Sequence, residues 1–255
     1  MTKPTVAIVG LGLIGGSLAR ALTRAGYGVI GVDRDSVRRR AVRAGAVAGT
    51  TGTVEGAAGV DVLVLAAPPE ANLRLLRRVA RVARPGLVIT DVGSVKRPIV
   101  QEAARLGLRG FVGGHPMAGT EGAGFLASSA DLFVGRPWVV TPAGDAAAVR
   151  RVRGMARAVG ARPVEVAAAA HDRAVAFLSH LPQVMAWALA AAARGDATAG
   201  RWLSLAGPGF HDMTRLARSP RGLWREILSQ NDAEVARALG AFVRALRRGS
   251  SGSRR

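Results

Sequence analysis

The chain contains no cysteine, and this absence removes several kinds of chemistry at once. Disulfide bonds, thiolate nucleophiles and cysteine-ligated zinc sites are all excluded. Histidine is also rare, since the chain has only His115, His171, His180 and His211. Their spacing matches no HExxH-like pattern, and we therefore predict that the protein holds no metal ion.

Aromatic residues and lysines are scarce as well. The chain has a single tyrosine, lysine occurs only at positions 3 and 96, and the net charge of +19 therefore comes almost entirely from arginine. These arginines are spread along predicted helices, and they are not interleaved with aromatic residues as in surfaces that stack bases. We therefore expect no nucleic-acid partner. A positive field would nevertheless attract anionic substrates and a dinucleotide.

The chain also lacks a long apolar run. No segment reaches the ~18 uninterrupted apolar residues that a membrane-spanning helix needs. The apolar N-terminal stretch is broken by glycines and followed by Arg20, which fits a strand, a turn and a helix better than a signal peptide. We expect a soluble, cytoplasmic protein that binds no membrane. Its 255 residues, 49% of them hydrophobic, suffice for one large or two modest domains.

Short apolar runs alternate with segments of helical periodicity over the first 167 residues. The runs lie at residues 5–9, 29–32, 60–66, 87–90, 111–114, 138–141 and 163–166. The helical segments lie at residues 13–25, 36–44, 71–83 and 146–159. The runs are continuously apolar, which is typical of a parallel sheet covered by helices on both faces. We therefore predict an α/β domain over residues 1–167, with a Rossmann-like, doubly wound and mainly parallel sheet.

The character of the chain changes after residue 167, where Ala/Leu-rich segments replace the strand pattern. Helix starts are indicated at Ser219-Pro220 and at Asn231-x-x-Glu234. We predict a C-terminal all-helical domain over residues 168–247 and a disordered tail over residues 248–255. The helices carry more apolar residues than one face needs, so we expect a homodimer that forms through this domain.

The Gly10-x-Gly12-x-x-Gly15 motif predicts a dinucleotide site, because it directly follows the first predicted strand and opens a helix. Gly10 permits the tight turn, Gly12 lets the backbone approach a pyrophosphate, and Gly15 lets the helix pack closely on the sheet. The pyrophosphate is expected on the N–H groups at the start of the helix, which include those of Leu13 and Ile14.

Asp33 indicates which dinucleotide this site favours. It ends the second predicted strand, 18 residues after Gly15, where an acidic residue binds the ribose hydroxyls and repels a 2′-phosphate. We therefore expect NAD rather than NADP, although the neighbouring Arg34 could tolerate a phosphate and keeps NADP open. Ala67 and Pro68 follow the next strand and are expected to line the adenosine side of the cleft.

Four further motifs accompany the glycine motif. They are Asp91-Val-Gly-Ser94-Val-Lys96, His115-Pro-Met-Ala-Gly-Thr-Glu121, Ser179-His180-Leu-Pro182 and Gly209-Phe-His211-Asp-Met-Thr-Arg215. With these motifs the chain resembles, over nearly its whole length, the prephenate/arogenate dehydrogenase family of tyrosine biosynthesis. The resemblance implies an oxidative decarboxylation, in which a cyclohexadienol loses a hydride to nicotinamide and its ring carboxylate as carbon dioxide. Such a reaction needs a base near the hydroxyl, cations for two carboxylates and a dry pocket.

His115 is the candidate general base. It directly follows a predicted strand, so it should face the cleft, where a neutral imidazole can accept the hydroxyl proton. Ser94 is the second catalytic candidate, since it could hydrogen-bond His115 and contact the nicotinamide. It could equally cap a helix that begins near Val95. Two interpretations of Lys96 stay open, an ion pair with Asp91 or a surface charge.

Arg215 is the expected anchor for a substrate carboxylate, because a guanidinium fork binds a carboxylate through two parallel hydrogen bonds. His180 and Gln183 share a predicted helical face with Trp187, and Pro182 should bend this helix. The substrate contacts that the resemblance implies are Glu121, His180, Gln183, His211 and Arg215. Some prephenate-preferring members carry a histidine in place of Gln183, so arogenate, or both substrates, stays open.

Two other classes of protein fit parts of the sequence. β-Hydroxyacid dehydrogenases and imine reductases share the Rossmann-plus-helices plan, but they rely on a lysine or an acid in the helical half, and this half contains no lysine. A non-catalytic protein that senses a dinucleotide or binds nucleic acid is the non-enzyme alternative. His171 and Asp172, at the expected domain junction, fit either a structural pairing or a role in the site.

Overall fold

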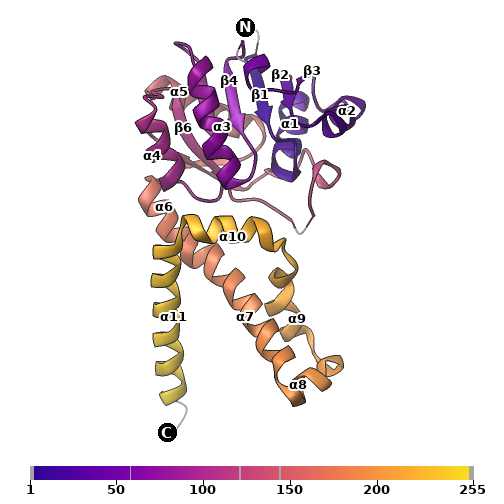
Figure 1. The fold of residues 1–255 in the computed structure, drawn as a ribbon, viewed down its shortest axis with the longest axis vertical. Helices are drawn as coiled ribbons and strands as arrows, with labels where there is room; N and C mark the ends of the chain where they lie inside the picture. Colours follow the sequence, from indigo (N-terminus) through magenta and orange to yellow (C-terminus); the bar gives the residue numbers. More distant parts are fainter. Residues whose placement is uncertain (1–2, 58, 121, 144, 253–255) are drawn as a thin grey trace. The chain divides into compact units, whose positions relative to one another are not determined.

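The computed structural model describes residues 3–57, 59–120, 122–143 and 145–252 of the chain. Contacts between Cα atoms form two compact units, which are divided in the chain between His171 and Asp172. The first unit contains a β-sheet with helices on both faces, and the second is helical in its described residues (Figure 1).

The described part of the first unit forms one sheet of eight strands in the order β3-β2-β1-β4-β5-β6-β7-β8. The strands are β1 (Thr5–Val9), β2 (Gly28–Val32), β3 (Gly49–Thr51), β4 (Val62–Leu65), β5 (Val88–Asp91), β6 (Phe111–Pro116), β7 (Pro137–Thr141) and β8 (Arg162–Glu165). Strands β1 to β6 are parallel, β7 is antiparallel to β6, and β8 is parallel to β7. The prediction of a Rossmann-like, mainly parallel sheet is therefore confirmed. The strand order reverses between β1 and β4, and such a switch point opens a ligand crevice at the carboxyl ends of the strands.

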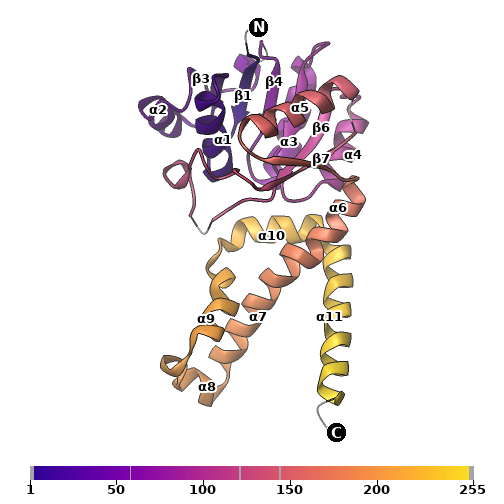
Figure 2. The same cartoon turned by 180° about the vertical axis from the view of Figure 1, so that it is seen from behind.

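Helices cover both faces of this sheet. They are α1 (Leu13–Arg24), α2 (Asp35–Arg43), α3 (Pro69–Val82), α4 (Arg97–Arg105) and α5 (Ala146–Ala158). Figure 1 shows α3 and α4 on the near face, and Figure 2 shows α1 and α5 on the other. Two hydrophobic clusters lie under these helices, and alternate residues of β1 enter each of them, with Val6 and Ile8 in one and Ala7 and Val9 in the other. Burial on both faces explains why the strands are continuously apolar.

Two features of the sheet went beyond the sequence patterns. The short edge strand β3 has the sequence Gly-Thr-Thr, which carries no apolar signal. Strand β6 continues past the expected end at residue 114 through Pro116, so His115 lies within the strand rather than in the loop after it. Glycines allow this close packing, because a Cβ on Gly113 would lie 2.2 Å from Oγ1 of Thr141 and one on Gly114 would lie 2.5 Å from the carbonyl oxygen of Asp91.

The second unit is built from helices in its described residues. They are the end of α6 (Ala168–Val175), a π-helical turn (Ala176–His180), α7 (Leu181–Gly195), α8 (Ala197–Arg201), α9 (Pro208–Thr214), α10 (Arg221–Gln230) and α11 (Asp232–Gly252). A small core joins the π-helical turn and α7 to α11 through Ala176, Leu181 and Ala238. Helix α11 includes residues 248–252, for which the sequence predicted disorder. The helix continues past its last apolar residue, and this is why the prediction was wrong. Residues 253–255 of that expected tail lie outside the described residues.

The π-helical turn Ala176–His180 ends two residues before Pro182. Proline has no N–H group, so it cannot hydrogen-bond the carbonyl one turn earlier, and the chain accommodates this by a wider turn. A π-helical turn that carries His180 at its end thus lies just before Pro182, where the sequence predicted a bend.

Among the described residues, one helical segment, Ala168–Gly195, is long and apolar enough to cross a membrane by length and composition alone. It contains polar and charged residues, so it is not the uninterrupted apolar run that the sequence was found to lack. The core helix of a soluble protein meets the same criteria, and this segment carries the buried polar residues His171, Asp172, His180 and Gln183. Buried polar groups of this kind favour a helix that packs against protein.

Candidate active site

The turn between β1 and α1 has the backbone and the space for a pyrophosphate. Gly10 has φ +98°, and a Cβ at Gly15 would lie 1.9 Å from the carbonyl oxygen of Gly10, so neither position accepts a side chain. A Cβ at Gly12 would meet nothing within 4 Å. Gly12 also precedes α1 without a side-chain cap, and the first N–H groups of a helix, here at Leu13 and Ile14, have no partner within the helix and can bind an anion.

Asp33 lies beside this turn, at the end of β2. Its Oδ2 accepts a hydrogen bond from the backbone N of Leu11 at 2.7 Å, and its Oδ1 accepts one from the N of Arg34 at 2.6 Å. A carboxylate oxygen has two lone pairs, so both oxygens can still accept from a ribose diol. The Arg34 side chain is 86% exposed, and its Nε lies 4.0 Å from Oδ1 of Asp33.

Asn72 organises the turn after β4 and was not singled out in the sequence. Its side chain is buried, and its Oδ1 accepts a hydrogen bond from the backbone N of Ala67 at 3.1 Å. The backbone N of Asn72 donates to the carbonyl of Pro68. The only sequence signal was an asparagine in the first turn of the helix that starts at Pro69. The structure thus places Ala67 and Pro68 in a turn at the carboxyl end of β4 that the Asn72 side chain hydrogen-bonds.

A buried ion pair shapes the loop after β5. Nζ of Lys96 donates to Oδ2 of Asp91, and both side chains are at most 1% exposed. Oδ2 of Asp91 also accepts from the N of Gly93 at 2.8 Å, and Oδ1 accepts from the N of Gly114 at 3.1 Å. The surface interpretation of Lys96 was therefore wrong. The pair ties the loop that carries Ser94 to the strand residue directly before His115.

Ser94 is half-buried in this loop. Helix α4 begins at Arg97 with Lys96 as its N-cap residue, so Ser94 does not cap this helix. The hydrogen bond from Ser94 to His115 stays a prediction.

His115 contacts a second histidine. Its Nδ1 lies 2.9 Å from Nε2 of His171, and the two rings meet edge to face with centroids 5.1 Å apart. Both residues are buried, at 9% and 2% exposure. His171 lies in α6 at the end of the first unit, so the unit that holds the glycine turn also holds this histidine pair.

In the second unit, His180 is held by Asn231, which the sequence had indicated only as a helix start. Nδ2 of Asn231 lies 3.2 Å from Nδ1 of His180 and donates to the carbonyl of Asp172 at 2.8 Å. Because Nδ2 of an asparagine is a donor, Nδ1 of His180 is the acceptor. The His180 ring also packs edge-on against Trp224, with centroids 6.0 Å apart.

Gln183 joins α7 to the segment of Arg215. Its Nε2 donates to the carbonyl oxygen of Leu216 at 2.7 Å, and its Oε1 is buried without a hydrogen-bond partner among the described residues. Arg215 begins a 3-10 turn, Arg215–Arg218, and is exposed, as is His211 in α9. Glu121, the remaining candidate, lies outside the described residues.

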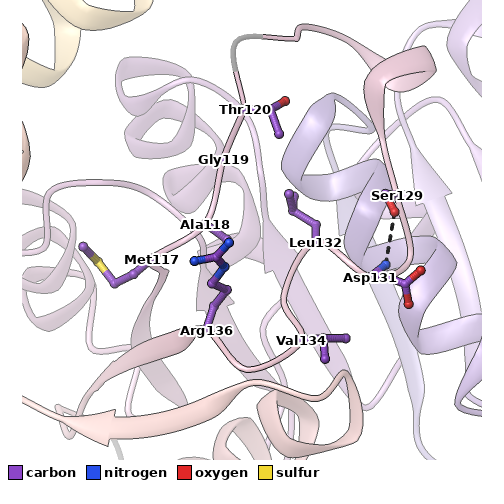
Figure 3. Close-up of a pocket in the computed structure, with 9 residues that line it drawn as sticks. All are labelled: Met117, Ala118, Gly119, Thr120, Ser129, Asp131, Leu132, Val134 and Arg136. Carbon is purple, nitrogen blue, oxygen red and sulfur yellow. Dashed lines mark hydrogen bonds between the residues drawn. The ribbon is translucent and has the colours of Figure 1, made fainter. Parts of the chain in front are cut away.

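A cavity of about 410 Å³ lies next to the residues that directly follow β6, the strand that contains His115 (Figure 3). Its walls are formed by Met117, Ala118, Gly119, Thr120, Ser129, Asp131, Leu132, Val134 and Arg136. None of the candidate site residues that the structure describes lines it, and it lies beside the loop that leaves β6.

The sequence matches two family descriptions that together cover most of the chain. Residues 18–165 match "Prephenate dehydrogenase, nucleotide-binding domain", and residues 167–250 match "Prephenate dehydrogenase, dimerization domain". Prephenate dehydrogenase of Lactococcus lactis subsp. cremoris is 33% identical over 233 residues, which are 89% of this chain and 64% of that protein. The chain thus spans less than two thirds of the length of this relative.

Two solved structures are similar over both units. Prephenate dehydrogenase from Aquifex aeolicus in complex with hydroxyphenyl propionate and NAD+ is 29% identical with a TM-score of 0.91, and the match covers 97% of this chain and 90% of that one. Synechocystis arogenate dehydrogenase is 31% identical with a TM-score of 0.84, and the match covers 96% and 90% of the two chains.

Proposed function

The chain belongs to the prephenate dehydrogenase family, and we propose that it converts prephenate to 4-hydroxyphenylpyruvate by oxidative decarboxylation, with NAD as hydride acceptor, in tyrosine biosynthesis. One observation carries the proposal most: buried His115 lies near the carboxyl end of β6, in the same sheet whose β1 leads into the open glycine turn. A base and a dinucleotide site at one edge of one sheet are what a hydride-transfer reaction on an alcohol needs.

The residues present fit NAD. The open space over Gly12, the first N–H groups of α1 and the acceptor oxygens of Asp33 match a pyrophosphate and a ribose diol. The similar Aquifex structure contains NAD+, which supports the same assignment. When bound, NAD would supply the carbon that accepts the hydride. The exposed Arg34 leaves NADP as the less favoured alternative.

His115 would manage the proton of the substrate hydroxyl. This proton moves to His115 as the hydride leaves the carbon that bears the hydroxyl. It returns to the ring oxygen when the bond to the ring carboxylate breaks and carbon dioxide departs. The ring becomes aromatic in that step, and no proton is gained or lost over the cycle. Ser94 would contact the nicotinamide and orient His115, because its loop is fixed by Asp91 and Lys96.

The helical unit would supply the groups that bind the substrate. Arg215 would hold a carboxylate through its guanidinium fork, and Gln183 would position it, since Gln183 is bonded to the carbonyl of the next residue. We assign further substrate contacts to Glu121, His180 and His211. His180 is the best supported of these, because Asn231 and Trp224 fix its ring.

Arogenate is the second candidate substrate. Nε2 of Gln183 donates a hydrogen bond to the carbonyl of Leu216. The amide atom left to contact a substrate is therefore Oε1, which is an acceptor. An ammonium group, as in arogenate, can donate to such an acceptor, whereas the keto group of prephenate cannot. The similarity to Synechocystis arogenate dehydrogenase points the same way.

We further propose a soluble, cytoplasmic homodimer that forms through residues 168–247, with the dinucleotide-binding domain in residues 1–167. The match to a dimerization domain supports it. So do exposed apolar side chains in the helical unit, among them Leu178, Leu205, Met213 and Leu246.

A four-way assay tests the function. NADH or NADPH formation is followed with prephenate and with arogenate, each with NAD and with NADP. The highest kcat/KM is expected for prephenate with NAD. A clear preference for arogenate would select the second candidate, and no turnover of either substrate would refute the activity and leave a dinucleotide-binding protein.

A further inference from the structure

We propose that His171 is a positioning residue that holds His115 in the one tautomer able to act as a base. The inference rests on the proposed function, in which His115 accepts the substrate proton. The observation behind it is the 2.9 Å contact between Nδ1 of His115 and Nε2 of His171, made by two buried rings at an interplanar angle of 79°.

The contact constrains where the protons lie. Two ring nitrogens at hydrogen-bond distance need one donor and one acceptor, because two lone pairs or two N–H groups would repel each other. A base must present a lone pair to the hydroxyl, and with Nδ1 turned to His171 this lone pair is on Nε2 of His115. A neutral His115 then carries its proton on Nδ1 and donates it to His171. His171 is therefore the acceptor, with its own proton on Nδ1.

The contact also gains strength during the reaction. When Nε2 takes the hydroxyl proton, His115 becomes an imidazolium, and its hydrogen bond to His171 becomes charge-assisted, roughly twice as strong as a neutral one. An interaction that is stronger in the transition state than in the ground state raises kcat rather than affinity. The proton returns from Nε2 to the ring oxygen after decarboxylation, so His171 neither gains nor loses a proton over the cycle.

The fold leaves this task to a side chain. The backbone of His115 is fixed within β6 by its pairing with Val139 of β7 and by the contact of Gly114 with Asp91. Backbone pairing does not select the tautomer of a ring. His171, 56 residues later in the chain, is in turn fixed by its backbone N, which donates to the carbonyl of Ala167 at 2.9 Å at the start of α6.

Nitrogen NMR of histidine-labelled full-length protein reads the tautomer directly and does not require turnover. The chain has four histidines, so the His115 signals can be assigned with single variants. We expect Nδ1-protonated His115 in the wild type, a change to the Nε2-protonated form in His171→Leu, and retention of the Nδ1-protonated form in His171→Gln, whose Oε1 can accept the same hydrogen bond. The proposal would be overturned by a wild-type His115 protonated on Nε2, or by a His115 tautomer that is the same in His171→Leu as in the wild type.

Kinetics supply the second readout. In His171→Leu, kcat should fall by about 10- to 100-fold, the range for partners that fix a histidine tautomer, while the KM for substrate and the Kd for NAD stay as in the wild type. The acid limb of the kcat profile should move to lower pH, because the imidazolium has lost an acceptor, and His171→Gln should recover much of the loss. Equal losses in both variants would mean that His171 only fills space.

Arg173→Gln is the matched control on the same helix. Arg173 is 61% exposed and contacts Glu234 at 3.7 Å, so its replacement disturbs α6 without touching the histidine pair. Its kcat should be unchanged, and a loss equal to that of His171→Leu would contradict a specific role for His171. If the wild type turns over neither substrate, the proposed function fails, whereas the NMR result still decides what His171 does to His115.

Discussion

At the scale of single residues, Asp33 would serve the proposed cofactor site in two ways. Its carboxylate fixes the glycine turn through the N of Leu11 and offers lone pairs to a ribose diol. We predict that Asp33→Ala raises the KM for NAD by about 10- to 100-fold, as expected when a hydrogen bond to a charged group worth ~1.5–3 kcal/mol is lost. NADP should suffer less, since repulsion of its 2′-phosphate is removed while Arg34 remains.

Asp35→Ala is the control for this variant, because Asp35 is an exposed acid nearby whose partners, Arg38 and Arg39, lie on the same surface helix. Steady-state kinetics with both dinucleotides measure the effect. A wild type that already prefers NADP would show that Asp33 does not select the cofactor.

Arg215 provides a second prediction at this scale. Arg215→Ala should raise the KM for the substrate far more than that for NAD. Removal of the bidentate partner of a carboxylate lowers the binding free energy by on the order of 2–5 kcal/mol. Arg215→Lys should recover only part, since an ammonium lacks the planar fork. Arg218→Ala, at the end of the same 3-10 turn, is the matched control. Small and equal effects on both ligands would assign Arg215 to the surface.

At the scale of elements, the loop between β5 and α4 is held by a fully buried ion pair. Lys96→Met should destabilise the protein by about 3–5 kcal/mol, because it leaves the Asp91 carboxylate buried without its cation. Urea unfolding measures this. The double variant Asp91→Asn with Lys96→Met should regain part of the loss, since no buried charge then remains. A single variant as stable as the wild type would show that water reaches Asp91.

Helices α3 and α4 are joined by a surface cluster with a predictable pH dependence. Hydrogen bonds from Arg105 and then Arg77 lower the pKa of Glu102 to about 2 from 4.5. A lowered pKa means that the cluster stabilises the fold above about pH 4.5 and that this contribution is lost as the pH falls toward 2.

Glu102→Gln should therefore lower the free energy of unfolding at neutral pH by less than ~1 kcal/mol, as expected for a surface cluster, and lower the Tm slightly with it. The difference from the wild type should vanish near pH 2. Thermal unfolding across this pH range checks it. A Tm difference that stays constant as the solution is acidified would contradict the assigned ion pairs.

At the scale of the whole molecule, local patterns predicted the sheet and the glycine turn because their information lies within a few neighbouring residues. The partners of the site residues could not be predicted in this way. His171 meets His115 and Asn231 meets His180 across 56 and 51 residues. Such pairs are made by tertiary packing, and no spacing in the sequence announces them. The helical end of the chain was missed for a related reason, since polar composition alone does not stop a helix.

The account depends most on His115 as the base beside the dinucleotide site, and the kcat of His115→Asn tests it most directly. We predict a loss of about 10²- to 10⁴-fold, the usual span for a general base, with the Kd for NAD unchanged in a binding titration of the same preparation. Intact NAD binding with lost turnover would place the defect in proton transfer. A variant that binds NAD and turns over substrate at nearly the wild-type rate would contradict the account.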